Sequence, residues 1–191
     1  TMLSDAFAPE REFSLVRTAI VEADIGDAMA AVMGANLLAS PVPRAMMWVR
    51  DLPNRVIARL KGEPLSAVPT AVTFGDIAQD GPWQMLASTP DREFVAGAIG
   101  RFWQRDYGWA DVDVDQFADY CEPDQAKTLV SFRLEPYGQS RTLVVYESRT
   151  VTTDAQAHRR FRRYWLALRP FIGVMMATAL TAIRREAEGS R

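Results

Sequence analysis

Six polar side chains occur in runs of strand-forming residues, where a sheet could present them to a bound molecule. They are Glu93, Arg101, Arg133, Tyr146, Glu147 and Arg149. Carboxyl, guanidinium and phenol groups orient a ligand carbonyl or hydroxyl, and they also move protons where burial shifts their pKa values. Because side chains alternate between the two faces of a strand, the face on which each residue lies decides whether it reaches a ligand.

The alternation of side chains assigns some residues of two predicted strands to the inner or the outer face of the sheet. Phe132 shares a face with the apolar residues two positions before and after it, so we predict that Phe132 points inward and Arg133 outward. Arg101 shares its face with Trp103 and with two apolar residues of the same run. Arg101 and Trp103 are therefore candidates for the inner face.

The last strand, by contrast, remains ambiguous. Glu147 and Arg149 share one face with three apolar residues, whereas Tyr146 and its apolar neighbour occupy the other. If Glu147 and Arg149 point inward, they form a mutually satisfied charge pair that orients a ligand. If they point outward, they form a surface ion pair worth under about 1 kcal/mol.

Two other patterns suggest chemistry less strongly. The carboxylates of residues 111–122 follow much of the spacing of a calcium loop, but Gln116 stands where the sharp turn needs glycine, so we interpret them as a solvated acidic loop. The single histidine, His158, and the single cysteine, Cys121, have no spacing that links them to a nucleophile. They are also too few for a zinc site or an internal disulfide. The sequence predicts no catalytic residue, no metal and no cofactor.

Composition describes one soluble domain over residues 1–191. The chain has 22 basic and 24 acidic residues with a net charge of -2, and it carries no nucleic-acid-binding motif. Its most apolar window, residues 172–183, is shorter than the roughly 20 residues that cross a bilayer, so we expect no integral membrane segment. With no signal-peptide pattern at the start, we expect a cytoplasmic protein, as a monomer or a homodimer.

Helical and strand periodicities divide the chain. Residues 13–21 read as a strand, and Asp24 can begin a short helix that Gly34 ends. A second helical region covers residues 43–61. Short extended runs then alternate with turn residues, which predicts an antiparallel meander. The expected strands are residues 72–78, 83–88, 93–103, 128–135 and 142–151.

The C-terminal part predicts one long helix over residues 155–187, with an unbroken apolar stripe. Thr153 and Gln156 have the spacing of a capping box, and Pro170 should kink the helix. The natural packing of these elements is an α+β fold in which a curved antiparallel sheet wraps around the long helix, with two short helices after the first strand.

Several segments of the chain resemble the START-like, SRPBCC superfamily, in a bacterial branch of it. The resemblance covers nearly the whole chain and is carried by residues 93–95, 97–103, 147–151 and 160–165 together with Phe117, Tyr120, Pro123, Ala126 and Lys127. It implies a helix-grip fold with an apolar cavity between the sheet and the long helix. It implies no catalytic triad and no cofactor motif, because members of the superfamily differ in activity more than in fold.

Large, soft side chains and the polar candidates together form the predicted ligand pocket. Aromatic and methionine side chains adapt around a flat or lipid-like molecule, and glycines in the third strand of the meander mark a bulge or a close approach. The expected lining residues are Trp48, Arg101, Trp103, Phe132, Tyr146, Glu147, Arg149, Trp165, Phe171, Met175 and Met176.

Three functions fit these expectations. The first is noncatalytic binding of a small hydrophobic or aromatic molecule, lipid- or polyketide-like, as a carrier or sensor. The second is a cyclase, aromatase or dehydratase that moves protons with Tyr146, Glu147 or an arginine and needs no metal or nucleotide. The third is a partner-binding module that uses the arginines of residues 159–163, which otherwise form the solvated face of the long helix.

Overall fold

The computed structural model describes residues 2–35, 73, 82–104 and 106–189. Three expectations therefore lie outside the described residues. They are the helix over residues 43–61, the candidate pocket residue Trp48, and the strand over residues 72–78 apart from Thr73.

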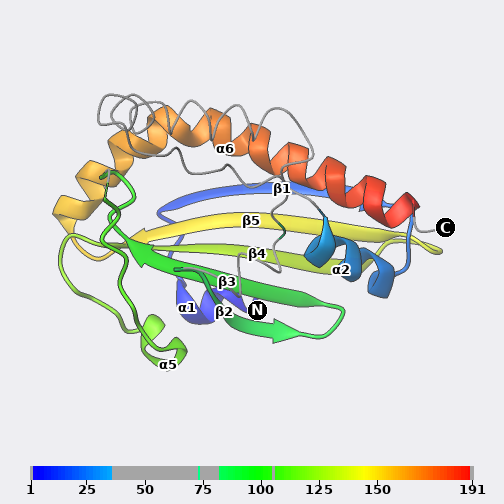
Figure 1. Cartoon of the computed structure of the whole chain (residues 1–191), viewed down its shortest axis with the longest axis horizontal. Coiled ribbons are helices and arrows are strands. Elements are labelled where there is room, and N and C mark those ends of the chain that lie inside the picture. The colour runs from blue at the N-terminus through cyan, green and yellow to red at the C-terminus, as the bar shows by residue number, and fades with distance from the viewer. Residues whose placement is uncertain (1, 36–72, 74–81, 105, 190–191) are drawn as a thin grey trace, which may run out of the picture.

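Helices at both ends of the described chain enclose an antiparallel sheet (Figure 1). The elements are α1 (Ser4–Phe7), β1 (Phe13–Val21), α2 (Ile25–Gly34), β2 (Gln84–Thr89), β3 (Glu93–Gly100), α5 (Val114–Phe117), β4 (Ala126–Pro136), β5 (Thr142–Thr152) and α6 (Ala155–Gly189). The strand order is β1-β5-β4-β3-β2, and every neighbouring pair is antiparallel. The predicted meander is confirmed for β2 to β5, and β1 adds to its far edge.

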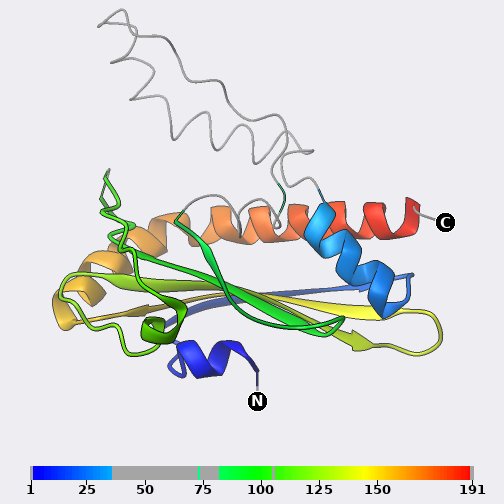
Figure 2. The ribbon, with the colours of Figure 1, turned by 60° about the horizontal axis from the view of Figure 1, so that its bottom comes forward.

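The layers identify a helix-grip arrangement. Long helix α6 crosses one face of the curved sheet, with α2 beside it, whereas α1 and α5 lie on the opposite face (Figure 2). We call these the α6 face and the α1 face. The predicted α+β class, with the sheet packed against a long C-terminal helix, is confirmed.

Both faces of the sheet carry buried apolar side chains. On the α6 face, Phe132, Val144 and Tyr146 pack with Trp165 and Met176 of the helix. On the α1 face, Val95, Ile99 and Leu129 pack with Phe117 of α5 and with Ala8, which follows α1. Strand β3 is buried at every position because both layers cover it.

Gly97 permits the close packing on the α1 face. A Cβ at this position would lie 2.7 Å from a carbon of Leu86, 2.7 Å from Phe117 and 2.9 Å from Leu129. Those separations are shorter than carbon–carbon contacts allow. The glycine therefore marks a close approach between side chains and the strand, one of the two interpretations that the sequence allowed.

The start of α6 differs from the expected capping box. The Asp154 carboxylate accepts hydrogen bonds from the backbone N–H groups of Gln156 and Ala157, both at 2.7 Å. Thr153 instead bonds the backbone of Gln125, which precedes β4. The predicted capping role of Thr153 was therefore wrong: Asp154, the next residue, caps the helix, because the Thr153 hydroxyl is hydrogen-bonded to Gln125. The helix continues through Pro170 to Gly189.

Helix α6 also corrects the expectation about apolar length. It contains an 18-residue window of mean hydropathy 1.7, so by length and composition it is the one helix in the described parts of the chain that could cross a membrane. The window taken from the sequence, residues 172–183, was shorter than this one, which tolerates up to two charged residues. In this structure, α6 buries Phe161, Trp165 and Met176 against the sheet, as a core helix does.

Candidate functional site

A row of stacked aromatic rings crosses the α6 face of the sheet. Phe94 of β3 pairs in register with Phe132 of β4, and Phe132 pairs with Tyr146 of β5. The ring centroids are 5.3 Å apart for the first pair and 4.2 Å for the second, and both pairs are stacked. Residues directly opposite on neighbouring strands have touching side chains, so three separate strands build one continuous flat surface.

A second aromatic group lies where α6 begins. Phe161 is central in it: its ring centroid lies 4.8 Å from that of Phe13 on β1, 6.1 Å from Trp165 and 6.3 Å from Trp103. Trp165 and Met176 are buried on the sheet side of α6, as expected. The two aromatic groups belong to one apolar cluster on the α6 face, and Trp103 packs against that cluster.

Trp103 supplies an unusual polar atom to this apolar cluster. Its indole Nε1 is buried and has no hydrogen-bond partner within the described chain. A buried donor without an acceptor costs about 1–3 kcal/mol, so such groups are rare in folded proteins. The nitrogen is therefore the one polar atom of this cluster that lacks an acceptor among the described residues.

Arg101 does not join Trp103 on the inner face. Strand β3 ends at Gly100, and a turn follows in which the Arg101 N–H donates to the Tyr107 carbonyl at 2.6 Å. Alternation therefore stops before Arg101, whose half-exposed side chain lies 4.0 Å from the carboxylate of Asp124. The same carboxylate accepts a 2.6 Å hydrogen bond from Arg160 of α6. Arg101 thus belongs to a surface charge cluster.

Glu147 and Arg149 lie on the α1 face, away from α6. Arg149 donates to both oxygens of Glu147, at 3.1 Å and 2.9 Å. It also donates to the carboxylate of Asp5 at 2.9 Å and to the carbonyl of Ala8 at 2.6 Å. The pair is therefore neither in the space between the sheet and α6 nor a surface pair, because the N-terminal segment covers it and leaves Arg149 only 1% exposed.

The charge network affects the groups that it joins. The hydrogen bond from Arg149 holds the pKa of the Asp5 carboxyl below its ordinary value. Ser14 of β1 donates to Glu147 at 3.1 Å, so the Glu147 carboxylate is held from two strands and has no role facing α6. We interpret the network as the fastening of the N-terminal segment to the sheet.

Tyr146 stands alone as a titratable member of the aromatic row. Burial raises the pKa of its phenol far above the ordinary value, so the group stays protonated and cannot act as a base near neutral pH. With Glu147 on the opposite face, the acid–base pair that a cyclase would need from these two residues does not form. The α6 face is suited to binding.

Two expected pocket residues point away from the sheet. Phe171 and Met175 are exposed on α6, although Met176 beside them is buried. Consecutive residues on a helix are separated by about 100° of rotation, so Met175 and Met176 cannot share a face. The apolar stripe predicted for this helix is wider than the surface that the sheet covers.

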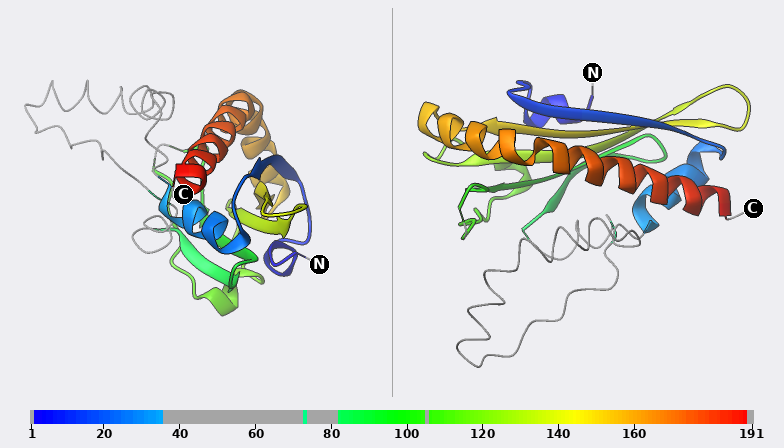
Figure 3. Two further views of the ribbon diagram at one scale, coloured as in Figure 1. Left: turned by 90° about the vertical axis from the view of Figure 1, so that its right-hand side faces the viewer. Right: turned by 90° about the horizontal axis from the view of Figure 1, so that it is seen from above.

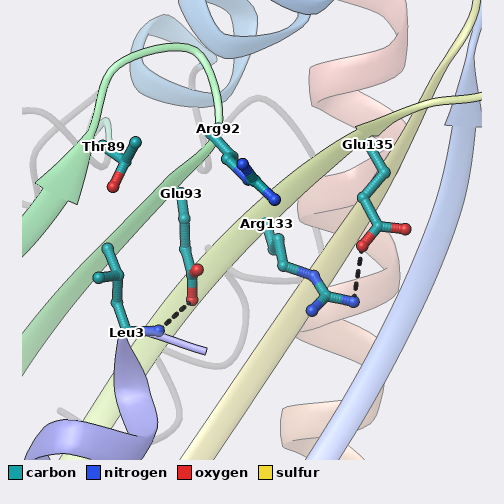
Figure 4. Close-up of a pocket in the computed structure, with 6 residues that line it drawn as sticks. All are labelled: Leu3, Thr89, Arg92, Glu93, Arg133 and Glu135. Atoms are coloured by element: carbon teal, nitrogen blue, oxygen red, sulfur yellow. Dashed lines mark hydrogen bonds and ion pairs between the residues drawn. The ribbon is translucent and has the colours of Figure 1, made fainter. Parts of the chain in front are cut away.

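A small polar pocket opens at the edge of the α1 face (Figure 4). It has a volume of about 280 Å³, and its lining residues are Leu3, Thr89, Arg92, Glu93, Arg133 and Glu135. Arg133 points to this face, opposite Phe132, as predicted, and pairs with Glu135 at 2.8 Å. Burial raises the pKa of Glu93, which accepts the Leu3 N–H at 2.8 Å. These contacts mainly fix the N-terminal segment.

Sequence reasoning missed Phe94, the first ring of the aromatic row. Phe94 occupies the same face as Phe132 only because β3 and β4 pair with Phe94 opposite Phe132. Alternation within β3 alone does not separate its faces, because apolar residues occupy both. The face of Phe94 can be assigned from the sequence only once the pairing of β3 with β4 is known.

Comparisons with known proteins concern architecture only. No family model and no curated protein matches the chain. Among solved structures, protein MLL2253 from Mesorhizobium loti is similar over 94% of this chain and 99% of its own, at 10% identity and a TM-score of 0.42. Mll3558 from Rhizobium loti is similar over 91% and 96%, at 13% identity and a TM-score of 0.37.

CalU16 from Micromonospora echinospora is similar over 93% of this chain and 84% of its own, with 15% identity and a TM-score of 0.32. At these identities and TM-scores, none of the solved structures assigns a family or an activity to this chain.

Proposed function

We propose that this protein is a START-like, SRPBCC-type domain that binds a small hydrophobic or aromatic molecule without chemical change. The molecule is lipid- or polyketide-like, and it lies on the α6 face, against the aromatic clusters of the sheet and α6. The row formed by Phe94, Phe132 and Tyr146 is a flat apolar stack with defined geometry. Its rings are buried on this face, so a bound molecule would contact them by displacing side chains that cover them. Apolar burial at about 25 cal/mol per Å² supplies the affinity of such a complex.

The single observation that carries the proposal is the unpartnered indole N–H of Trp103. A ligand carbonyl or hydroxyl oxygen would accept this hydrogen bond and remove the penalty of burying the donor. One polar contact in an apolar surface fixes the orientation of a ligand without dominating its affinity. The preferred ligand is therefore a flat or chain-like apolar molecule that carries an acceptor oxygen.

Native mass spectrometry of the purified protein is the first test, since a bound molecule appears as an added mass. The second is a fluorescence titration with two matched probes, flavone and 2-phenylnaphthalene, of which only flavone carries a carbonyl. Trp103→Phe keeps an aromatic ring and removes the N–H. We expect it to weaken flavone binding by roughly 2- to 10-fold, the value of one neutral hydrogen bond.

The same substitution should leave the binding of 2-phenylnaphthalene unchanged, because that probe has no acceptor. Trp109→Phe is the matched control, since Trp109 follows in the same loop with its side chain 39% exposed. The control should bind both probes like the parent protein. Equal flavone affinity in the parent and in Trp103→Phe would remove the assigned role of the indole, and failure of both probes to bind would reject the binding surface.

A further inference from the structure

Helix α6 has a charge pattern unlike that of the whole chain. Residues 155–185 contain seven arginines and no aspartate or glutamate, although the net charge of the chain is -2. The arginines are Arg159, Arg160, Arg162, Arg163, Arg169, Arg184 and Arg185. An acidic protein thus presents one strongly basic helix, and this asymmetry indicates an anionic partner.

Most of these guanidinium groups have no carboxylate partner within the described parts of the chain. Arg160 pairs with Asp124 at 2.6 Å and Arg184 with Glu188 at 2.9 Å. The other five are exposed and form no ion pair with any residue that the structure describes. Ion pairs among the described residues therefore do not account for the accumulation of charge on this helix.

Exposed apolar side chains lie between the two groups of arginines. Leu166 is 64% exposed, Phe171 51%, Val174 47% and Met175 43%. They are four of the eight large hydrophobic residues that are exposed in the described parts of the chain, and they fall within ten consecutive positions. Single exposed apolar residues are ordinary, but a contiguous group marks an interaction surface.

Helix geometry joins these residues into one surface. At 3.6 residues per turn, Arg159, Arg163, Leu166 and Val174 follow one line along the helix. Phe171 lies about 60° to one side of Val174, and Met175 lies about 40° further round, at the border with the buried side. The buried residues Phe161, Trp165 and Met176 occupy the side that faces the sheet. Seen from above in Figure 3, α6 runs along the outside of the sheet. We call the exposed residues the outer stripe of α6.

We propose that the outer stripe of α6 binds the surface of an anionic membrane. A helix lying in the plane of the interface buries exposed Leu, Phe, Val and Met side chains among the lipid chains, while arginines at its ends reach the phosphates. An acidic protein surface would pair with the guanidinium groups but would leave the apolar centre without a partner. Because the other side of α6 is buried against the sheet, the helix lies on the membrane and does not cross it.

Sedimentation of the full chain with lipid vesicles tests this proposal. We expect binding to vesicles of equimolar phosphatidylcholine and phosphatidylglycerol, and much weaker binding to pure phosphatidylcholine. Added salt should weaken the binding, because it screens the attraction between arginines and phosphates. Each unpaired arginine near the lipid surface strengthens binding by about 5-fold.

A pair of matched double variants separates the outer stripe from general surface properties. Arg163→Gln with Val174→Ser removes one charge and one apolar group from the stripe, and we expect vesicle binding to fall by about 10-fold or more. Arg92→Gln with Val16→Ser is the control. Val16 is 45% exposed and, like Arg92, lies away from α6, so this variant should bind like the parent.

Three outcomes would overturn the proposal: no binding to the mixed vesicles, equal binding to both vesicle types, or equal loss in the two double variants. Binding to polyglutamate without binding to vesicles would show that the stripe recognises an acidic polypeptide instead. Circular dichroism of each variant establishes that the fold is retained. Because the stripe lies on the opposite side of α6 from the sheet, these results are independent of the flavone titration.

Discussion

The two faces of the sheet are stabilised in different ways by the same strands. On the α6 face, β3, β4 and β5 present a row of stacked rings whose members make apolar contacts. On the α1 face, β5 presents Glu147 and Arg149, which are buried and hydrogen-bonded to each other, and Arg149 also bonds the N-terminal segment. An apolar surface can contact a bound molecule without losing hydrogen bonds, whereas a buried charge network is destabilised when any of its partners is missing. We therefore place the proposed ligand binding on the α6 face and the fastening of the N-terminal segment on the α1 face.

The largest expected effect comes from removing Arg149, which joins the N-terminal segment to the sheet. Arg149→Met leaves Glu147 buried without its partner, and we expect the free energy of unfolding to fall by about 3–5 kcal/mol. Urea denaturation measures the loss. Adding Glu147→Leu to this variant removes the uncompensated charge and should recover much of the stability. A single variant as stable as the parent protein would contradict the buried network.

Removing an aromatic side chain from the α6 face should have a smaller effect on stability but a direct effect on binding. Trp165→Ala deletes an indole that packs against Phe13 and Phe161, so we expect a loss of about 3 kcal/mol in thermal or urea unfolding. Flavone binding should weaken as well. Leu166→Ala, at the neighbouring exposed position, is the control and should leave both quantities near the parent values. Unchanged stability and binding in Trp165→Ala would reject its assigned position.

The smallest expected effect is a change in pH dependence. Arg149 lowers the pKa of Asp5 below its ordinary value of 3.8. A carboxyl with a lowered folded-state pKa stabilises the fold above its unfolded pKa, and this stability is lost as the pH falls through the folded value. Asp5→Asn should therefore lower stability at neutral pH and flatten the decline below about pH 4.

Urea unfolding at a series of pH values compares this variant with Asp111→Asn, an exposed carboxylate in the loop before α5. The control should follow the parent curve. If Asp5→Asn shows the same acid-dependent loss of stability as the parent protein, then the pairing of Asp5 with Arg149 contributes nothing measurable.

The sequence predicted the elements whose signals are local. Strand β1 and helix α2 begin and end as expected, because a run of β-compatible residues, an Asp24 start and a Gly34 end are encoded in neighbouring residues. Short helices α1 and α5 were not predicted, since four residues carry no periodic signal and depend on contacts with the sheet.

The candidate site was predictable only in part, because only some of its residues are assigned by local sequence signals. Phe132, Trp165 and Met176 were assigned correctly to the surface between sheet and helix because periodicity determines their faces. Arg149 was not, because its partner Asp5 lies 144 positions away and no local rule connects them. Phe171 and Met175 show the reverse error: Met175 was included in the apolar stripe of the helix and Phe171 was chosen by its residue type, but the sheet covers a narrower side of α6.

The strand order has a consequence for how the protein is made. Strand β1 is synthesised before the other strands of the sheet, yet its neighbour in the sheet is β5, which is synthesised more than a hundred residues later. Until then β1 has no hydrogen-bonding partner in this sheet, and Asp5 has no arginine to hold. During synthesis, β1 and the N-terminal segment must therefore remain unpaired with this sheet until β5 has been made, and the edge of the sheet forms only then.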